Sequence, residues 1–319
     1  MSLLLARADA RALPLRDGSV QCCVTSPPYW GLRDYGTPGQ LGLETTPAEY
    51  VEHMVDVFRE VRRVLRDDGV LWLNLGDCYA TGAGKVGKCP GGGAQGEAWA
   101  ERGAMTQPNR MPLPGLKPKD LVGIPWRVAF ALQADGWYLR SDVIWHKPNP
   151  MPESVTDRPT RAHEYLFLLT KAARYYYDAE AVKERSTGQT GAASNFKRTT
   201  KDHIIPGQSV TQHREEREPT EDNGSRNLRS VWTVTTQPYK GAHYATFPTK
   251  LVEPCIKAGS RVGDIVLDPF CGTATVARVA IAHGRRAVGF DLSGEYLSKL
   301  ATKRTHNVQI DLLSATGAR

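Results

Sequence analysis

Apolar and polar positions predict an alternation of strands and helices over residues 1–80. Residues 19–24 form a short, mostly apolar run that predicts a strand. A helix is expected to begin at Thr46-Pro47-Ala48-Glu49, a capping box with proline at the first helical position. Apolar side chains then recur at helical spacing, and Asp67-Asp68-Gly69 is expected to end the helix. Residues 70–75 are nearly all apolar, as expected for a central parallel strand covered on both faces.

The same alternation returns in the second half of the chain. The pattern predicts a helix over residues 124–134 and strands over residues 137–145 and 164–170. Residues 265–291 predict a strand, a tight turn, a helix that ends near Gly284 and a second strand. Alternating strands and helices predict an α/β fold with a doubly wound, mostly parallel sheet.

Two stretches interrupt this pattern. Residues 80–120 are rich in glycine, proline, lysine and glutamine and predict a long loop, and loops of such length are seldom neutral connectors. Residues 183–229 are polar and of mixed charge, which predicts either a disordered insertion or a small module that orders on a partner. We therefore expect one domain formed by residues 1–182 and 241–319, with residues 183–240 inserted between its halves.

The 319-residue chain has an ordinary globular composition, with 40% hydrophobic and 24% charged residues. Its net charge of +7 gives weak support for a polyanionic partner. No apolar run is long enough to cross a membrane, and the first residues lack the pattern of a signal peptide. The six cysteines form no C-x-x-C pair and the histidines are not spaced with them as zinc ligands, so we expect reduced thiols and no metal site.

The first candidate site is Ser26-Pro27-Pro28-Tyr29, at the end of the strand predicted over residues 19–24. Neither proline has an N–H group and each has a restricted φ, so the pair ends the strand pairing and stiffens the corner. The corner offers the Ser26 hydroxyl, carbonyl oxygens and the aromatic face of Tyr29. These groups suit a flat ring that carries an amino group, although a strand-ending turn is the simpler explanation of the tetrapeptide on its own.

The second candidate site is the βαβ pattern over residues 265–291. Such a unit binds an adenosine-containing cofactor, and an acidic residue about 20 residues on binds the ribose hydroxyls. The turn lacks the three glycines that approach a pyrophosphate, which disfavours a nicotinamide cofactor. A single glycine, Gly272, with Asp268 before it suits a cofactor that carries an amino acid in place of phosphates. A purely structural turn is an equally good interpretation of this unit alone.

Together the two sites resemble the amino-group DNA methyltransferases that use S-adenosylmethionine, in the permuted order that places the catalytic motif before the cofactor motif. Ser26-Pro27-Pro28-Tyr29 matches the Asp/Asn/Ser-Pro-Pro-aromatic motif of that family. Asp268-Pro269-Phe270-x-Gly272 matches its methionine-binding loop, and Ala274 departs from it, since the family loop commonly has a second glycine there. The resemblance covers most of the chain and implies a Rossmann-like class I methyltransferase fold with S-adenosylmethionine as cofactor.

The resemblance also implies a role for particular residues. Asp291 would bind the ribose, Asp9, which precedes the strand at residues 19–24, would face the adenine, and the polar region 183–240 would recognise DNA. Residues 145–149 and 163–165 look like family strands beside the target pocket. The implied catalytic residues are Ser26, Pro27, Pro28 and Tyr29, and the implied cofactor contacts are Asp9, Thr246, Phe247, Pro248, Asp268, Pro269, Phe270, Gly272, Thr273 and Asp291. The implied DNA contacts are Arg185, Lys197, Arg198, Lys201, Arg214, Arg217, Arg226 and Arg229.

Members of that family methylate an exocyclic amine of a base that has left the duplex. The Ser26 hydroxyl and the Pro27 carbonyl would accept the two hydrogens of the amine, and Tyr29 would stack on the base. In the family, serine at the first motif position goes mostly with cytosine N4, so Ser26 favours cytosine N4 and leaves adenine N6 as the alternative. Methylation of a ring carbon would need a cysteine nucleophile, but Cys255 has the helical spacing of a core thiol.

The resemblance implies duplex DNA as the substrate. It also implies a cytoplasmic, nucleoid-associated protein of prokaryotic or phage type. A cognate restriction endonuclease and a homodimer remain open as further partners. The more distant alternatives are a non-catalytic nucleic-acid-binding protein with the same fold and an enzyme that methylates RNA or a protein amide.

Overall fold

The computed structural model describes residues 3–80, 115–186, 224–236 and 248–305 of the chain. The chain divides into two compact units. The larger unit comprises Met1–Asp178 and Arg229–Arg319, and the smaller unit comprises Ala179–Leu228. Among the described residues, no helix combines the length and the apolar character needed to cross a membrane.

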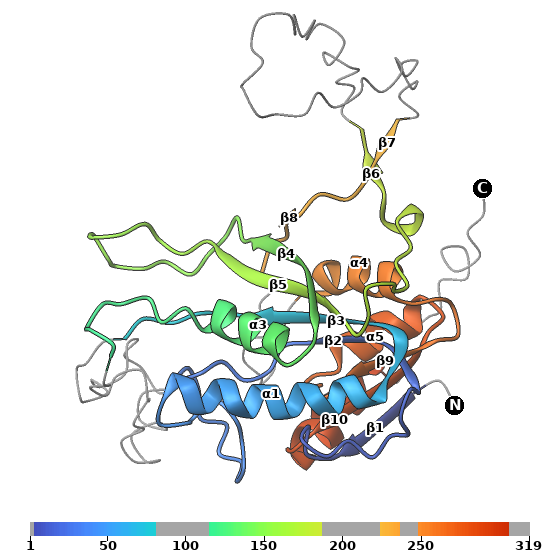
Figure 1. Ribbon diagram of the computed structural model, residues 1–319, viewed down its shortest axis with the longest axis horizontal. Helices are drawn as coiled ribbons and strands as arrows, with labels where there is room; N and C mark the ends of the chain where they lie inside the picture. Colours follow the sequence, from blue (N-terminus) through green and yellow to red (C-terminus); the bar gives the residue numbers. More distant parts are fainter. Residues whose placement is uncertain (1–2, 81–114, 187–223, 237–247, 306–319) are drawn as a thin grey trace, which may run out of the picture. The chain divides into compact units, whose positions relative to one another are not determined.

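One mixed sheet of eight strands organises the larger unit, in the order β1-β10-β9-β2-β3-β5-β4-β8 (Figure 1). The first five strands in this order are parallel, β5 is antiparallel to both β3 and β4, and β8 is parallel to β4. The sheet confirms the predicted doubly wound, mostly parallel α/β fold. Its strands are β1 (Leu3–Arg7), β2 (Val20–Thr25), β3 (Leu65–Leu75), β4 (Tyr138–His146), β5 (His163–Thr170), β8 (Val231–Thr233), β9 (Ile265–Asp268) and β10 (Arg286–Asp291).

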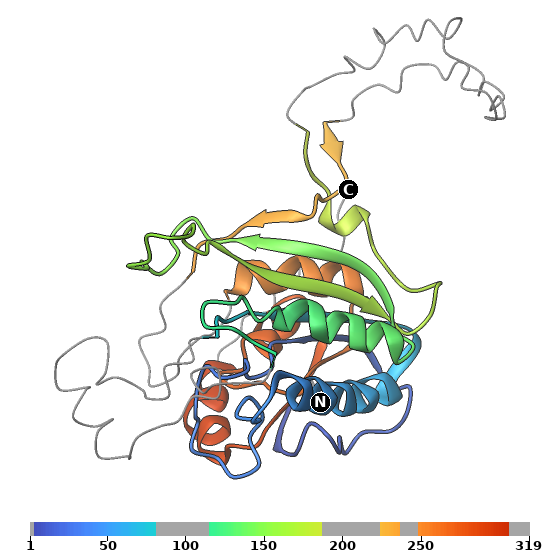
Figure 2. The same ribbon diagram turned by 60° about the vertical axis from the view of Figure 1, so that its left-hand side comes forward.

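Helices cover both faces of this sheet (Figures 1 and 2). On one face, α1 and α3 pack together over Leu71, Leu73 and Phe167, all of which are buried. On the other face, α4 contacts β2 and β3, and α5 contacts β9 and β10. Because successive side chains of a strand point to opposite faces, the apolar residues of the central strands supply both cores. Within the described residues, the helices of this unit are α1 (Pro47–Val64), α3 (Ile124–Ala134), α4 (Thr249–Gly259), α5 (Thr275–Ala282), the π-helix η4 (Tyr296–Ala301) and α6 (Thr302–Thr305).

The first helix begins where the capping box predicts and ends earlier than expected. Thr46 Oγ1 accepts the backbone N–H of Glu49 at 3.2 Å, while the Glu49 carboxylate accepts the N–H of Thr45 at 3.0 Å. The predicted end at residues 67–69 was wrong, because α1 ends at Val64 and β3 already begins at Leu65. Leu65 is fully buried and pairs with Val20 of β2, so strand pairing takes over from the helix.

An edge strand that the apolar pattern did not predict precedes the others. β1 pairs in parallel with β10, and this register places Arg7 opposite Asp291. Its residues are half-buried or exposed, as expected for an edge strand, so they lack the apolar run of a central strand. Asp9 therefore follows a strand, at the same sheet edge as Asp291.

The smaller unit contains the short 3-10 helix η2 (Glu180–Val182) and one antiparallel pair, β6 (Glu184–Arg185) with β7 (Ser225–Arg226). Residues 187–223, which make up most of the predicted insertion, lie outside the described residues. Trp232 of β8 packs against Trp72 of β3, with ring centroids 5.9 Å apart, and thus belongs to the larger unit. The boundary between the units therefore falls at Leu228, before the end of the region predicted at 183–240.

Close packing of α4 on the sheet gives a test of the fold. A Cβ atom at Gly259 would lie 2.7 Å from Val70 Cγ2 and 2.9 Å from Cys22 Sγ. We expect Gly259→Ala to destabilise the protein by about 1–3 kcal/mol, because the core must move to accept a methyl group. Gly294→Ala is the matched control, since a Cβ there meets nothing within 4 Å. Urea denaturation measures both, and equal stabilities would contradict this packing.

Candidate functional site

A cavity lies at the carboxyl ends of β1, β2, β9 and β10. The strand order reverses here, because the chain leads from β2 through α1 to β3 on one side and from β9 through α5 to β10 on the other. Such a reversal leaves a crevice that is the usual ligand site of open α/β sheets. The cavity brings together the predicted residues Asp9, Ser26, Pro28, Asp268, Pro269, Phe270, Gly272, Thr273 and Asp291.

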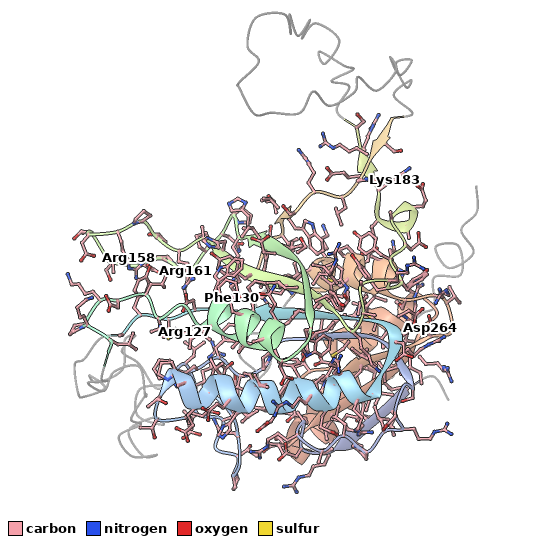
Figure 3. All side chains as sticks on the ribbon, viewed as in Figure 1. Arg127, Phe130, Arg158, Arg161, Lys183 and Asp264 are labelled. Atoms are coloured by element: carbon pink, nitrogen blue, oxygen red, sulfur yellow. The ribbon has the colours of Figure 1, made fainter. Side chains whose placement is uncertain are left out.

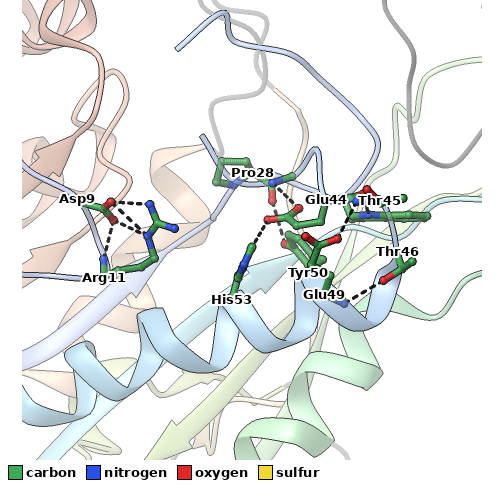
Figure 4. A network of polar contacts seen from close by, with 11 residues as sticks. Asp9, Arg11, Pro28, Glu44, Thr45, Thr46, Glu49, Tyr50 and His53 are labelled. Carbon is green, nitrogen blue, oxygen red and sulfur yellow. Dashed lines mark hydrogen bonds and ion pairs between the residues drawn. The ribbon is translucent and has the colours of Figure 1, made fainter. Parts of the chain in front are cut away.

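The Ser26–Tyr29 corner follows β2 directly and is held from the side of α1. The Tyr50 hydroxyl, from the first turn of α1, donates a hydrogen bond to the Pro28 carbonyl at 2.9 Å (Figure 4). Trp30 Nε1 donates to the backbone carbonyl of Glu44 at 2.9 Å. Because Tyr50 and Trp30 are both buried, these hydrogen bonds hold the corner in one position on the wall of the cavity.

Tyr29 is not among the residues that line the cavity. Its hydroxyl lies 2.8 Å from Glu164 Oε2, 3.1 Å from Asn74 Oδ1 and 3.3 Å from Ser26 Oγ. Its ring lies against Gly76, where an added Cβ would be 2.4 Å from Tyr29 Cε2. Burial raises the pKa of this phenol well above its usual value. Tyr29 is therefore a neutral, fixed side chain, and the predicted stacking on a base stays a prediction.

Asp268 ends β9 and lies beside the end of β2. Its Oδ1 accepts the Thr25 hydroxyl at 2.7 Å and the Phe270 N–H at 3.1 Å. The side chain is only 3% exposed, and this burial raises the pKa of the carboxyl to about 7. The cavity thus contains a carboxyl that changes charge near neutral pH and can respond to a cationic ligand.

Asp291 ends β10 on the other side of the turn. Its two carboxylate oxygens accept the N–H groups of Gly272 at 3.0 Å and Ser293 at 2.8 Å, and burial raises its pKa. Each oxygen has a second lone pair that can accept a hydroxyl. Ala274 has φ 57°, in the left-handed region, which explains physically why a glycine would suit this position.

Asp9 lines the cavity together with an arginine partner. Arg11 donates to both carboxylate oxygens of Asp9, with a shortest distance of 2.7 Å, and the Asp9 oxygen also accepts the Arg11 backbone N–H (Figure 4). The hydrogen bond from the Arg11 side chain lowers the pKa of Asp9. Asp9 is therefore ionised at neutral pH and accepts hydrogen bonds only.

The segment after the corner also lines the cavity, and the sequence interpretation missed it. Tyr35, Thr37, Gln40 and Leu41 face the cavity from this segment, and Tyr296 faces it from η4. A cluster of glycines was the available signal. Gly31, Gly36, Gly39 and Gly42 all have positive φ, and a Cβ at Gly42 would lie 3.0 Å from the Tyr29 carbonyl oxygen.

Several predicted residues lie elsewhere. Pro248 is the N-cap of α4 and is not among the residues that line the cavity, and Pro27 is not among them either. Arg185 and Arg226 lie on the paired strands of the smaller unit, where Arg226 bonds Glu184 at 2.8 Å, and Arg229 is exposed just before β8. The following predicted residues lie outside the described part of the chain: Lys197, Arg198, Lys201, Arg214, Arg217, Thr246 and Phe247.

Cys255 confirms the prediction of a core thiol. It is fully buried in α4, and its Sγ donates to the Leu251 carbonyl at 3.3 Å. Burial raises the pKa of the thiol well above its usual value, so the reactive thiolate is disfavoured.

The connection between β4 and β5 is anchored to the end of β3. Figure 3 shows Arg158 and Arg161 on this connection. The Arg158 guanidinium lies 3.9 Å from the Tyr79 ring centroid, and Arg161 pairs with Asp77 at 3.5 Å. Asp77 Oδ1 in turn accepts the N–H groups at the start of α3. These contacts place two arginines beside the strand end that carries Gly76.

The fold, and the cavity where the strand order reverses, are typical of α/β enzymes that bind a cofactor at such a place. A family model described as DNA methylase matches residues 20–303. The chain is 46% identical to the Type II methyltransferase M.Cfr9I of Citrobacter freundii, over 97% of this chain and 88% of that protein. It is also 46% identical to the Type II methyltransferase M.SmaI of Serratia marcescens, over 89% of this chain and 83% of that protein.

Two solved structures share the fold at low sequence identity. PvuII DNA methyltransferase (cytosine-N4-specific) superposes with a TM-score of 0.62 at 17% identity and covers 99% of this chain and 90% of its own. TTHA0409 of Thermus thermophilus, complexed with S-adenosyl-L-methionine, has a TM-score of 0.55 at 21% identity and covers 98% of this chain and 95% of its own. The chain belongs to the N6/N4 DNA methylase family.

The buried contact between Thr25 and Asp268 can be tested through stability. Because the pKa of folded Asp268 lies above the value of 3.8 for an unperturbed carboxyl, Asp268 favours folding at low pH, and this contribution is lost as the pH rises to about 7. Removing the Thr25 hydroxyl takes a donor from the ionised carboxylate, so Thr25→Val should cost about 1.5–3 kcal/mol at pH 8 and less at pH 5. Thr25→Ser keeps the donor and is the control. A pH-independent loss measured by urea denaturation would contradict this assignment.

Proposed function

We propose that the protein transfers a methyl group from S-adenosylmethionine to the exocyclic N4 amine of a cytosine flipped out of duplex DNA. One observation carries the proposal: Ser26, at the start of the Pro-Pro corner, stands on the wall of the same cavity as Asp268 and Asp291. Methyl transfer needs the acceptor amine and the methyl donor within reach of each other, and one cavity wall supplies both positions.

The residues of the cavity fit S-adenosylmethionine, which supplies an electrophilic methyl group. Asp291 would accept the ribose hydroxyls, and the ionised Asp9 would accept the adenine amino group. The loop that begins at Asp268 would hold the amino acid end of the cofactor. There the buried Asp268 carboxyl would meet the cofactor's ammonium group. Further proposed cofactor contacts are Pro269, Phe270, Gly272 and Thr273. The family resemblance adds Thr246, Phe247 and Pro248.

The corner prepares the amine for attack. The lone pair of an exocyclic amine is delocalised into the ring, so the amine is a poor nucleophile until acceptors draw its hydrogens out of the ring plane. Ser26 Oγ and the Pro27 carbonyl are the proposed acceptors. Because Tyr50 binds the neighbouring Pro28 carbonyl and the prolines restrict the backbone, the acceptors need little reorganisation.

The choice of cytosine rests on Ser26, since serine at this motif position goes mostly with cytosine N4 in the family. DNA recognition is proposed for region 183–240, a polar sequence of mixed charge whose arginine and lysine side chains would bind phosphates and base edges. The relatives are named Type II methyltransferases, which supports a cognate restriction endonuclease as a partner in the same cell.

Product analysis tests the proposed reaction. The protein is incubated with unmethylated genomic DNA and methyl-labelled S-adenosylmethionine, and the DNA is digested to nucleosides. We expect label in N4-methylcytosine, and Ser26→Ala should slow transfer by roughly 10²–10³-fold, as for the loss of one preorganised polar contact. Label in N6-methyladenine alone would contradict the cytosine assignment, and a Ser26→Ala variant as fast as the wild type would contradict the site.

Asp268 predicts a pH dependence of cofactor binding. A cationic cofactor binds better to the ionised carboxylate, whose pKa is about 7 in the free protein. We therefore expect the ratio of the wild-type cofactor affinity to that of Asp268→Asn to depend on pH. Below pH 7 the ratio should rise by up to about tenfold per pH unit, and above pH 7 it should be constant. Isothermal titration calorimetry from pH 5.5 to 8.5 measures the difference. Parallel pH profiles for the two proteins would show that Asp268 does not interact with the cofactor's charge.

A further inference from the structure

Three hydrogen-bonding side chains connect the catalytic corner with the middle of the sheet. Ser26 Oγ lies 3.3 Å from the Tyr29 hydroxyl, and the Tyr29 hydroxyl lies 2.8 Å from Glu164 Oε2. Ser26 and Tyr29 come from the corner after β2, whereas Glu164 comes from β5. The three residues therefore form a relay that runs from the cavity wall to a carboxylate.

The carboxylate sets the direction of this relay. An ionised glutamate only accepts hydrogen bonds, and a phenol has a single hydrogen to donate. Two acceptors face the Tyr29 hydrogen, the charged Glu164 Oε2 at 2.8 Å and Asn74 Oδ1 at 3.1 Å, so the Tyr29 oxygen is left with lone pairs toward Ser26. The Ser26 hydroxyl consequently donates its hydrogen to Tyr29.

Neighbouring groups hold the Glu164 carboxylate in one position. Its Oε1 forms an ion pair with Lys147 of the β4–β5 connection, and the two side chains are only 17% and 18% exposed. Its Oε2 also accepts Asn74 Nδ2 at 3.2 Å, and the same Asn74 nitrogen donates to the Tyr165 carbonyl at 3.0 Å. The Lys147 ammonium lies 4.3 Å from the Trp145 ring centroid, which restrains it further.

We propose that Glu164 is a positioning residue that, through Tyr29, commits the Ser26 oxygen to act as an acceptor for the target amine. The inference rests on the proposed function of the corner. A serine hydroxyl can donate a hydrogen bond as well as accept one. If the Ser26 hydrogen pointed at the target amine, it would repel the hydrogens of the amine, and Ser26 could not accept either of them. An aspartate or asparagine oxygen at the same motif position only accepts, so a serine enzyme needs a place for the extra hydrogen, and the relay provides it.

A glutamine in place of Glu164 should weaken the relay. The Lys147 ammonium retains the amide oxygen as its acceptor, which turns the amide nitrogen toward Tyr29 and Asn74. The charged acceptor of the Tyr29 hydrogen would then be lost, and the neutral Asn74 Oδ1, 3.1 Å from the Tyr29 hydroxyl, would be the acceptor that is left. The Tyr29 hydrogen would therefore be held less firmly away from Ser26. The shape of the site is kept in Glu164→Gln, and Tyr29→Phe likewise keeps the ring that packs against Gly76.

The test uses the full-length protein with unmethylated genomic DNA and labelled S-adenosylmethionine under single-turnover conditions. We expect Tyr29→Phe to slow methyl transfer by roughly 10- to 1,000-fold, and Glu164→Gln, which keeps Asn74 Oδ1 as an acceptor, to slow it by roughly tenfold. Because both changes break one relay, the double variant should be within about threefold of the slower single variant. Tyr138→Phe, which removes a hydroxyl from an exposed tyrosine of β4, is the control and should keep the wild-type rate.

Cofactor affinity separates a positioning role from a structural one. Neither Tyr29 nor Glu164 lines the cavity, so the dissociation constant of S-adenosylmethionine, measured by calorimetry, should change less than about twofold in both variants. The relay is overturned if either variant transfers methyl groups at the wild-type rate, if the two losses multiply in the double variant, or if both variants lose cofactor binding. A wild-type protein that labels no DNA would instead overturn the proposed function itself.

Discussion

Everything at the site depends on the parallel pairing of β2 with β9. Cys22 lies opposite Val266 and Cys23 opposite Leu267, so two strands far apart in the sequence end side by side. The register brings Thr25 and Asp268 into a buried hydrogen bond of 2.7 Å. Because the proposed catalytic corner begins directly after Thr25 and the proposed cofactor loop begins at Asp268, this pairing joins the two halves of the proposed site.

The surroundings of the corner give it rigidity from three directions. Tyr50 of α1 binds the Pro28 carbonyl, Gly76 after β3 packs against the Tyr29 ring, and Glu164 of β5 accepts the Tyr29 hydroxyl. The corner therefore does not depend on its two prolines alone. Preorganised acceptors of this kind favour reactions in which charge develops on the bound group, as it does on an amine that gains a methyl group.

The local sequence predicted most of the fold, because its strands and helices have clear apolar periods and caps. The central strands, α1, α3 and the βαβ unit around Asp268 lie where expected. The end of α1 was misplaced because the pairing of Leu65 with Val20 is a tertiary contact that no local pattern contains. β1 was missed because an edge strand with half-exposed residues lacks a distinct apolar run.

By itself, the sequence determined the two motifs, their order and the kinds of side chain available for chemistry. Only the tertiary structure decided which partners those side chains have: Arg11 for Asp9, Thr25 for Asp268 and Glu164 for Tyr29. Motifs are encoded by neighbours along the chain, where short-range sterics act. The pKa of Asp268 and the direction in which Ser26 donates instead depend on burial and on residues from other strands, which only folding brings within hydrogen-bonding distance.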